Sequence, residues 1–348
     1  MRFQDIALAG LSHYLPEEVV TSPQLEERLA PLYARLSLSP GRLELLSGIR
    51  ERRAWPRGTR PSTVAARAGA LAIERAGLAR ERIGVLVHAS VCRDFLEPAT
   101  ASVVHRALGL APRCQAFDLS NACLGFANAL VVVAGMVERG EVEAGLVVAG
   151  EDGGPLVEAT IARLLAIADD AQADARGELK RAFASLTIGA GAAACVVTRG
   201  AFATTAPRLV GGASLAATEH VELCSGDFAA GLDGPLMATD SEALLRAGCE
   251  LAQRTWIEFE REVGWSRADV DRIVTHQVGS AHRRLLFESL GLDLARDFST
   301  FPTLGNMGSV SLPATLALAR EADFVRPGDR TALLGIGSGL QCLMLAVR

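Results

Sequence analysis

One unit occurs twice in this chain, first as Gly77-Leu-Ala-Arg-Glu-Arg-Ile-Gly-Val-Leu-Val-His-Ala89 and again as Gly264-Trp-Ser-Arg-Ala-Asp-Val-Asp-Arg-Ile-Val-Thr-His276. Each copy follows a helical pattern, over 62–76 and 241–263, and leads into a short aliphatic and β-branched run that is typical of a buried strand. Chance similarity in an Ala- and Val-rich chain is the weaker explanation, because the order, the spacing and the flanking glycines agree. The repeat predicts a duplicated fold.

Two further pairs of segments extend the repeat. Gly145-Leu-Val-Val-Ala-Gly150 parallels Ala332-Leu-Leu-Gly-Ile-Gly337, and the strand-like stretches 5–13 and 208–218 each contain an internal glycine. Strands that alternate with helices predict parallel sheets covered by helices on both faces. Two such halves related by pseudo-symmetry predict an α/β fold of five layers, in the order αβαβα.

The predicted halves are residues 1–200 and 201–348. The boundary falls in 198–207, where a strand-like run gives way to a polar, proline-containing stretch. An insertion over 152–186 lengthens the first half, and its segment 157–168 has the pattern of an amphipathic helix.

Composition excludes several classes of protein. A net charge of −5 does not support nucleic-acid binding, and no apolar run reaches the length of a membrane span. The seven cysteines include no CxxC spacing, which argues against a disulfide framework and against a zinc site. Free thiols and the lack of a signal-peptide pattern predict a cytoplasmic protein without a metal.

A candidate nucleophile lies in Asn121-Ala-Cys123-Leu-Gly125, between a strand-like run over 115–119 and a helical run over 126–137. A thiol at the start of a helix lies close to unpaired N–H groups and the positive end of the helix dipole, which favour the thiolate. A thiolate attacks acyl carbonyls, so Cys123 is the expected acyl-transfer nucleophile. The alternative is a buried structural cysteine.

The duplication brings two more candidates to the same place. Equivalent strands of the two halves end at the middle of the molecule, where ligands commonly bind in such sheets. His276 ends a strand of the second half, and Asn306 lies in the loop Gly305-Asn306-Met307-Gly308. We therefore expect Cys123, His276 and Asn306 to share one pocket, although a lone histidine on a strand is more often a satisfied core residue.

An ordered set of motifs covers almost the whole chain: Gly48-Ile-Arg-Glu-Arg-Arg53, Asn121-Ala-Cys123, Gly189-Ala-Gly191-Ala, His276-Gln277, Gly305-Asn306 and Gly335-Ile-Gly-Ser-Gly339. Together they resemble the thiolase superfamily in its ketoacyl synthase III branch. The resemblance implies a thiolase-like fold in which Cys123 carries the acyl group while His276 and Asn306 hydrogen-bond a thioester carbonyl. It also implies that the backbone N–H groups of Cys123 and Ser338 hold the oxyanion. The substrates that the resemblance implies are acyl-CoA or acyl carrier protein thioesters, with no cofactor.

The segment Cys92-Arg-Asp-Phe-Leu-Glu97-Pro-Ala-Thr100 resembles the olefin-biosynthesis thiolases, which join two fatty acyl-CoAs head to head without decarboxylation. In that subgroup a glutamate of this loop enters the active site of the opposite subunit, which implies a homodimer. Glu97 is a carboxylate in an otherwise apolar segment; if it is buried, its pKa would rise toward a value suited to a general base that removes an α-proton. The alternative is a surface carboxylate before a proline.

The predicted reaction is a non-decarboxylative Claisen condensation of two acyl-CoAs through acyl-Cys123, giving a β-keto acyl product. Three alternatives stay open: a decarboxylative synthase that uses a malonyl thioester, acyl transfer to an oxygen or nitrogen acceptor, and a non-catalytic partner subunit. The sequence departs from the ketoacyl synthase III pattern at two places, and the first weakens the alternative of a decarboxylative synthase that begins fatty-acid synthesis. Residues 42–47 lack the aromatic residue that contacts the adenine of CoA, and Thr187-Ile-Gly-Ala-Gly191 lacks the usual acid.

Overall fold

The computed structural model describes residues 1–228 and 234–348. Its strands are β1 (Arg2–Tyr14), β2 (Glu18–Thr21), β3 (Glu51–Ala54), β4 (Ile83–His88), β5 (Gln115–Asp118), β6 (Ala144–Glu151), β7 (Gly191–Arg199), β8 (Arg208–Ala216), β9 (Cys224–Phe228), β10 (Pro235–Thr239), β11 (Arg272–Thr275), β12 (Thr331–Gly337) and β13 (Gln341–Val347). Its α-helices are α1 (Ser22–Arg28), α2 (Ala30–Arg35), α3 (Arg42–Ser47), α4 (Pro61–Ala76), α5 (Thr100–Leu108), α6 (Gly125–Glu138), α7 (Gly154–Asp169), α8 (Ala175–Ala182), α9 (Ser241–Val263), α10 (Ser280–Leu290), α11 (Phe301–Leu304) and α12 (Ser311–Glu321).

Nine strands form one sheet in the order β11-β12-β13-β8-β1-β7-β6-β4-β5. The pairing of β1 with β8 joins two leaves, and the strand directions repeat outward from this pair. On one side β8, β13 and β12 are successively antiparallel and β11 is parallel to β12. On the other side β1, β7 and β6 are antiparallel and β4 is parallel to β6. The segments that repeat in the sequence therefore occupy equivalent strands, which confirms the predicted duplication.

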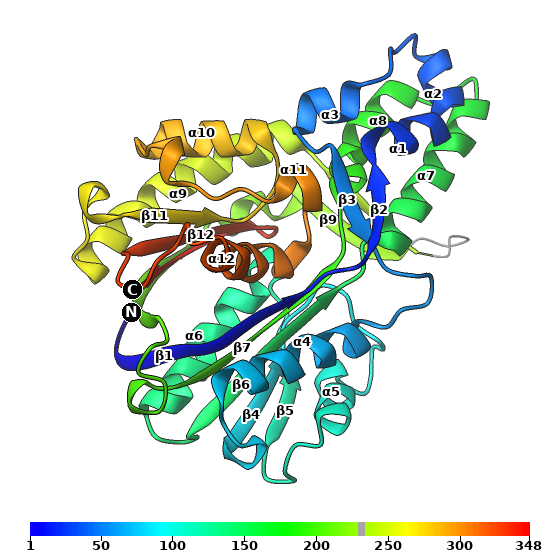
Figure 1. Cartoon of the computed structure of the whole chain (residues 1–348). Helices are drawn as coiled ribbons and strands as arrows, with labels where there is room; N and C mark the ends of the chain where they lie inside the picture. The colour runs from blue at the N-terminus through cyan, green and yellow to red at the C-terminus, as the bar shows by residue number, and fades with distance from the viewer. Residues whose placement is uncertain (229–233) are drawn as a thin grey trace.

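The helices complete five layers (Figure 1). Helices α6 and α12 lie between the two leaves and share one apolar core with their inner faces. Helices α4 and α5 cover the outer face of one leaf, and α9 and α10 cover the outer face of the other. Because α6 is covered by both leaves, it is apolar around most of its circumference rather than on one stripe.

The strands are not all parallel, contrary to the expectation from the sequence. The four central strands β7, β1, β8 and β13 run antiparallel to their neighbours. A continuous apolar run indicates that both faces of a strand are covered, but it does not indicate whether the strand runs parallel or antiparallel to its neighbours. The strand β6 is buried at every position although one of its neighbours is parallel and the other antiparallel.

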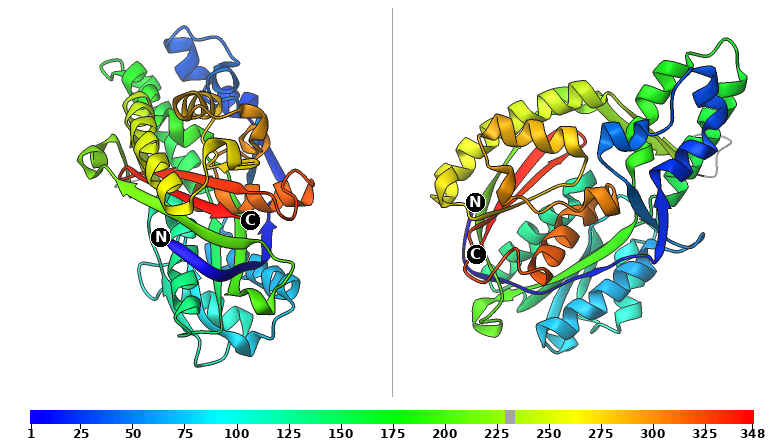
Figure 2. Two further views of the ribbon diagram at one scale, coloured as in Figure 1. Left: turned by 90° about the vertical axis from the view of Figure 1, so that its left-hand side faces the viewer. Right: turned by 45° about the horizontal axis from the view of Figure 1, so that its top comes forward.

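The insertion after β6 forms a lobe with its own small core. Its helices α7 and α8 pack with α1, α2 and α3, and Figure 2 shows this lobe projecting from the layered body. Leu29, Leu32 and Leu164 are almost fully buried in it. The helix predicted over 157–168 is confirmed by α7.

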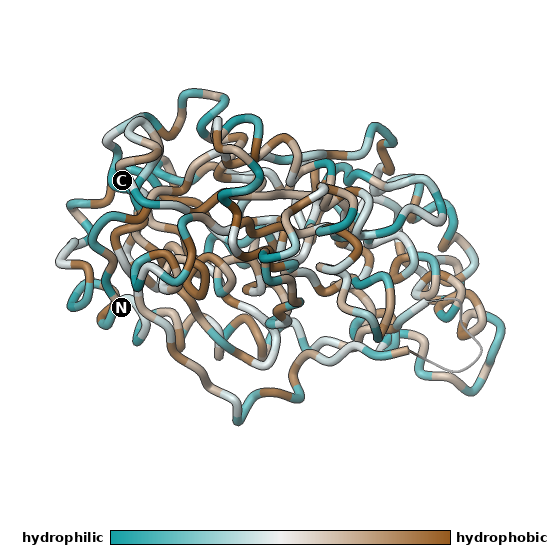
Figure 3. Tube along the Cα trace, turned by 90° about the horizontal axis from the view of Figure 1, so that it is seen from below, coloured by the Kyte–Doolittle hydropathy of each residue, from teal (hydrophilic) through white to brown (hydrophobic). Residues whose placement is uncertain are grey.

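Apolar and polar segments separate as expected for a layered α/β protein. Figure 3 shows hydrophobic stretches concentrated inside the molecule and hydrophilic ones in the peripheral loops. Within 1–228 and 234–348, no helix combines the length and the apolar character needed to cross a bilayer.

Candidate active site

Cys123 lies in a strained turn between β5 and α6. The turn is the short 3-10 helix η2 (Ala122–Leu124), and Ala122 has φ +45°, an uncommon conformation for a residue with a side chain. The Asn121 amide fixes the turn by donating to Asn128 Oδ1 at 2.7 Å and to Gln341 Oε1 at 3.2 Å. The turn is therefore tied both to α6 and to a strand of the other half.

The strand β12 approaches this turn closely. A Cβ atom on Gly337 would lie 3.0 Å from Leu124 Cγ, and one on Gly335 only 2.5 Å from Leu124 Cδ2. The glycines of the predicted motif over 335–339 are needed because a side chain on either would collide with the residue that follows Cys123. This contact brings the end of β12 to the candidate nucleophile.

The other two predicted residues enter from elements that meet the same turn. The N–H of His276 donates to the Leu334 carbonyl oxygen of β12 at 2.8 Å, so His276 lies beside that strand. Asn306 immediately precedes Met307 and the 3-10 helix η8 (Gly308–Val310), which packs against η2. The structure thus gathers the elements that carry Cys123, His276 and Asn306 around η2.

The imidazole of His276 is neutral at physiological pH. The residue is only 3% exposed, and burial, followed by the nearby His282, lowers the pKa of His276 to about 3. His282 is itself desolvated, which lowers its pKa to about 4. Among the described atoms, His276 Nδ1 is buried without a hydrogen-bond partner. A neutral imidazole is a hydrogen-bond donor that does not readily protonate a carbanion.

The side chain of Asn306 is held through its oxygen, and among residues 1–228 and 234–348 no hydrogen bond is seen for its side-chain amide nitrogen. Its N–H donates to the Thr187 carbonyl at 3.0 Å, and its carbonyl accepts from Gly189 N–H at 2.8 Å. Its side-chain Oδ1 accepts from Gly308 N–H at 3.0 Å. With the carboxamide oxygen occupied, the NH₂ group is left to donate to a ligand.

Burial disfavours the thiolate of Cys123, contrary to the expectation that the helix start favours it. Cys123 is half-buried, but its sulfur is desolvated. Burial first, and then the charges of Glu151 and Cys224, raise the pKa of Cys123 to about 12. Desolvation and a nearby carboxylate outweigh the helix end. The thiol must therefore lose its proton during attack rather than before it.

Glu97 is exposed in the single chain, so its action in the opposite subunit stays a prediction. Its loop, residues 91–99, also exposes Val91, Phe95 and Leu96, the last at 93%. Composition alone does not distinguish apolar residues that face a core from those that face outward. Within one chain the structure does not bring Glu97 into contact with the residues gathered at η2.

Ser338 lies in the turn that joins β12 to β13. Its Oγ donates to Cys224 Sγ at 3.3 Å, and Thr239 Oγ1 donates to the same sulfur at 3.4 Å. Since Cys224 acts electrostatically on Cys123, Ser338 and Cys224 both belong to the surroundings of the thiol.

Sequence reasoning missed Cys224 and Glu151. Glu151 ends β6, is 3% exposed, and accepts hydrogen bonds from Val91, Cys92 and Ser309. A carboxylate at the carboxyl end of an otherwise apolar strand was a usable signal for Glu151. The sequence offers no comparable signal for Cys224, which lies in a polar stretch.

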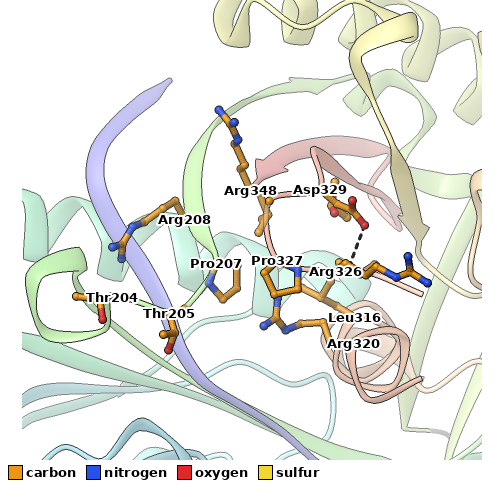
Figure 4. A pocket seen from close by; sticks show the side chains of 15 residues that line it. Thr204, Thr205, Pro207, Arg208, Leu316, Arg320, Arg326, Pro327, Asp329 and Arg348 are labelled. Carbon is orange, nitrogen blue, oxygen red and sulfur yellow. Dashed lines mark hydrogen bonds between the residues drawn. The ribbon is translucent and has the colours of Figure 1, made fainter. Parts of the chain in front are cut away.

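A cavity of about 440 Å³ lies elsewhere in the molecule (Figure 4). Its lining includes Arg208, Arg320 and Thr331, the first residue of β12. Gly337, at the other end of β12, packs on the turn of Cys123, and six strand residues span roughly 20 Å. This cavity is therefore separate from the candidate active site. Across the described ranges, no group of three or more His, Cys, Asp or Glu side chains is arranged to hold a metal ion.

Known proteins resemble this chain over its full length. Residues 261–348 match the family described as 3-oxoacyl-[acyl-carrier-protein (ACP)] synthase III C terminal. An acyl-CoA:acyl-CoA alkyltransferase of Xanthomonas campestris pv. campestris is 40% identical over 100% of this chain and 99% of its own. The enzyme of the same name from Shewanella oneidensis is 38% identical over 100% of both chains.

Solved structures are also similar to this chain over nearly its full length. Xanthomonas campestris OleA with bound cerulenin has a TM-score of 0.94 and 39% identity, covering 100% of this chain and 98% of that one. A form of the same protein with bound lauric acid and lauroyl-CoA has a TM-score of 0.92 and 38% identity, covering 99% of both chains. The protein is therefore an acyl-transferring enzyme of thiolase-like fold, and it belongs to the acyl-CoA:acyl-CoA alkyltransferase family within the ketoacyl synthase III branch of the thiolase superfamily.

Proposed function

We propose that this enzyme condenses two acyl-CoA molecules without decarboxylation and forms a β-keto acyl product through an acyl-Cys123 intermediate. The observation that carries the proposal is the gathering of three elements at η2, bearing Cys123, His276 and Asn306. The full-length similarity to proteins named acyl-CoA:acyl-CoA alkyltransferase supports the choice of substrates. With fatty acyl-CoA as substrate, the proposed reaction would belong to lipid metabolism.

The first step transfers an acyl group to sulfur. The thiol of Cys123 attacks the thioester carbonyl of the first acyl-CoA, the new S–C bond replaces the bond to CoA, and the thiol proton leaves with the CoA thiol. Negative charge develops on the carbonyl oxygen, and the backbone N–H groups of Cys123 and Ser338 stabilise it. The close packing of Gly337 on Leu124 supports this role for the Ser338 turn.

The second step forms the carbon–carbon bond. A carboxylate, Glu97 of the partner subunit, removes an α-proton from the second acyl-CoA, and the enolate oxygen accepts hydrogen bonds from His276 and Asn306. The enolate carbon attacks the acyl-Cys123 carbonyl, and the Cys123 sulfur leaves. Both groups can donate a hydrogen bond to an enolate without protonating it. The imidazole of His276 is neutral, and the carboxamide of Asn306 is held through its oxygen, which leaves its NH₂ group to donate.

The dimer is part of this proposal. Glu97 is exposed in a loop whose apolar side chains Val91, Phe95 and Leu96 are also exposed. A two-fold isologous interface would cover those side chains and deliver each Glu97 to the opposite subunit. The division into halves at 1–200 and 201–348 belongs to the same proposal. Seven free cysteines are in keeping with work in the reducing cytoplasm.

The test is incubation with lauroyl-CoA alone, with and without malonyl-CoA, followed by mass spectrometry of the protein and of the organic products. We expect acyl-Cys123 and a condensed product from lauroyl-CoA alone, and neither in Cys123→Ala. A strict requirement for malonyl-CoA with release of CO₂ would establish the decarboxylative alternative instead. Replacing lauroyl-CoA by its acyl carrier protein thioester identifies the preferred donor.

A further inference from the structure

Glu151 is the most heavily hydrogen-bonded carboxylate near the thiol, and the reaction proposed above does not use it. Oε1 accepts from Val91 N–H at 2.9 Å, Ser309 N–H at 3.1 Å and Ser309 Oγ at 2.7 Å. Oε2 accepts from Cys92 N–H at 3.0 Å. Four donors converge on one side chain that is 97% buried.

The donors come from two loops that are far apart in the sequence. Val91 and Cys92 open the loop 91–99, which carries Glu97, and Ser309 lies three residues after Asn306. These two loops carry the proposed base and one of the proposed enolate donors. A single carboxylate therefore connects the loop whose Glu97 would serve the partner's site with the segment that carries an enolate donor of its own site.

Glu151 is itself held firmly. Its carbonyl oxygen accepts from Trp55 Nε1 at 3.0 Å, and the Trp55 ring stacks on Tyr14 at 5.4 Å between centroids. Its side chain also needs the space over Gly308, where an added Cβ would lie 3.0 Å from Oε1 at a φ of +54°. The strand, the indole and this glycine fix where the carboxylate sits.

Only a carboxylate satisfies this set of donors. An ionised Glu side chain offers acceptor sites on both oxygens, whereas a Gln side chain must turn an NH₂ group toward an N–H group on one of the two sides. A buried N–H without an acceptor destabilises its loop by its full desolvation cost. Substitution by Gln would consequently release one loop at least.

We propose that Glu151 is a positioning residue that holds two segments in one fixed arrangement: the loop 91–99, whose Glu97 serves the partner's site, and the segment 306–309, whose Asn306 serves its own site. The inference rests on the proposed function for its mechanistic meaning, but the clamp itself is a property of the folded protein. Glu151 acts through the two loops and need not touch substrate.

The first experiment measures the clamp without substrate. Hydrogen–deuterium exchange of the full-length protein compares wild type, Glu151→Gln, Glu151→Asp and Ser309→Ala in peptides that cover 91–99 and 305–310. Glu151→Gln should speed exchange at least tenfold in one or both peptides. Ser309→Ala, which removes one hydroxyl donor, should affect 305–310 alone.

The matched control is Ser12→Ala, which removes another fully buried hydroxyl, one that donates to the Ala68 carbonyl at 2.7 Å outside both loops. It should leave both peptides unchanged. If Glu151→Gln does not fold, Glu151→Asp and Ser309→Ala carry the test. Aspartate keeps the charge but is one methylene shorter, so it should free at least one loop. Unchanged exchange in both peptides of a folded Glu151 variant overturns the proposal.

The second experiment separates positioning from a general loss of structure. In Glu151→Gln, condensation should fall at least tenfold more than acyl-Cys123 formation from lauroyl-CoA. Removing the charge should also move the alkylation of Cys123 by iodoacetamide to lower pH, because Glu151 helps to raise the pKa of that thiol. Equal losses in both half-reactions overturn the proposal. If wild type itself forms no condensed product, the proposed function fails, and the exchange data still decide the clamp.

Discussion

The protonated state of Cys123 makes a quantitative prediction for its reactivity. Burial and the Glu151 charge raise the pKa of the thiol from its ordinary value of 9.0 to about 12. Each pKa unit changes the thiolate fraction tenfold well below the pKa, so the thiolate fraction at pH 7 falls about a thousandfold, from about one in a hundred to about one in a hundred thousand. Alkylation by iodoacetamide proceeds through the thiolate and should slow by the same factor.

The assay follows modification of the peptide that contains Cys123 by mass spectrometry between pH 7 and pH 10. The logarithm of the rate should rise by one for each pH unit over this whole range, without a plateau. The same chain unfolded in denaturant is the control, and its Cys123 should level off near pH 9 because desolvation is lost. A plateau below pH 8 in the folded protein would falsify the reasoning and restore the activated thiolate that the helix start suggests.

Three further predictions follow from the same geometry. His276 is buried and His282 is half-buried, and desolvation lowers their pKa values to about 3 and 4 in the folded chain, against 6.5 in the unfolded chain. Their contribution to stability is therefore fully present above pH 6.5 and is lost as the pH falls toward those values, and thermal unfolding should show a loss of up to about 1.4 kcal/mol per histidine and pH unit. Mixed dimers of Glu97→Gln and Cys123→Ala should regain condensation that neither variant shows alone, because one site of each heterodimer is complete; no regain on mixing would mean that Glu97 does not act across the interface. Asn306→Ala should lower condensation about 10²–10³-fold and spare acyl-enzyme formation, as single-turnover product analysis would reveal; equal loss of acylation would contradict its role as an enolate donor.

The fold could be predicted from the sequence because its signals are local and repeated. The two copies of the strand-entry unit, at 77–89 and 264–276, lead to β4 and β11, which hold equivalent places in the sheet. The helix pattern over 241–263 coincides with α9. Apolar periodicity is a property of neighbouring residues, so it can be read without knowing the partners.

The candidate site could be predicted only in part from the sequence. The sequence by itself determined which residue types could carry the chemistry: Cys123 and His276 follow strands, and Asn306 lies in a glycine-flanked loop. The protonation behaviour of Cys123 and His276 was decided by tertiary structure alone. Desolvation and the placement of Glu151 depend on side chains that come from both halves, and they reversed the expectation for Cys123.

The directions of the strands and the exposure of the loop side chains were likewise decided by the tertiary structure. Apolar runs along β6 and β7 say that both faces are covered, but only hydrogen-bond pairing sets them antiparallel. The loop 91–99 reads as buried from its composition, yet its apolar side chains face outward. The physical reason is common to all these cases: burial, direction and charge environment are set by contacts between segments distant in sequence, whereas periodicity and turn chemistry are set by adjacent residues.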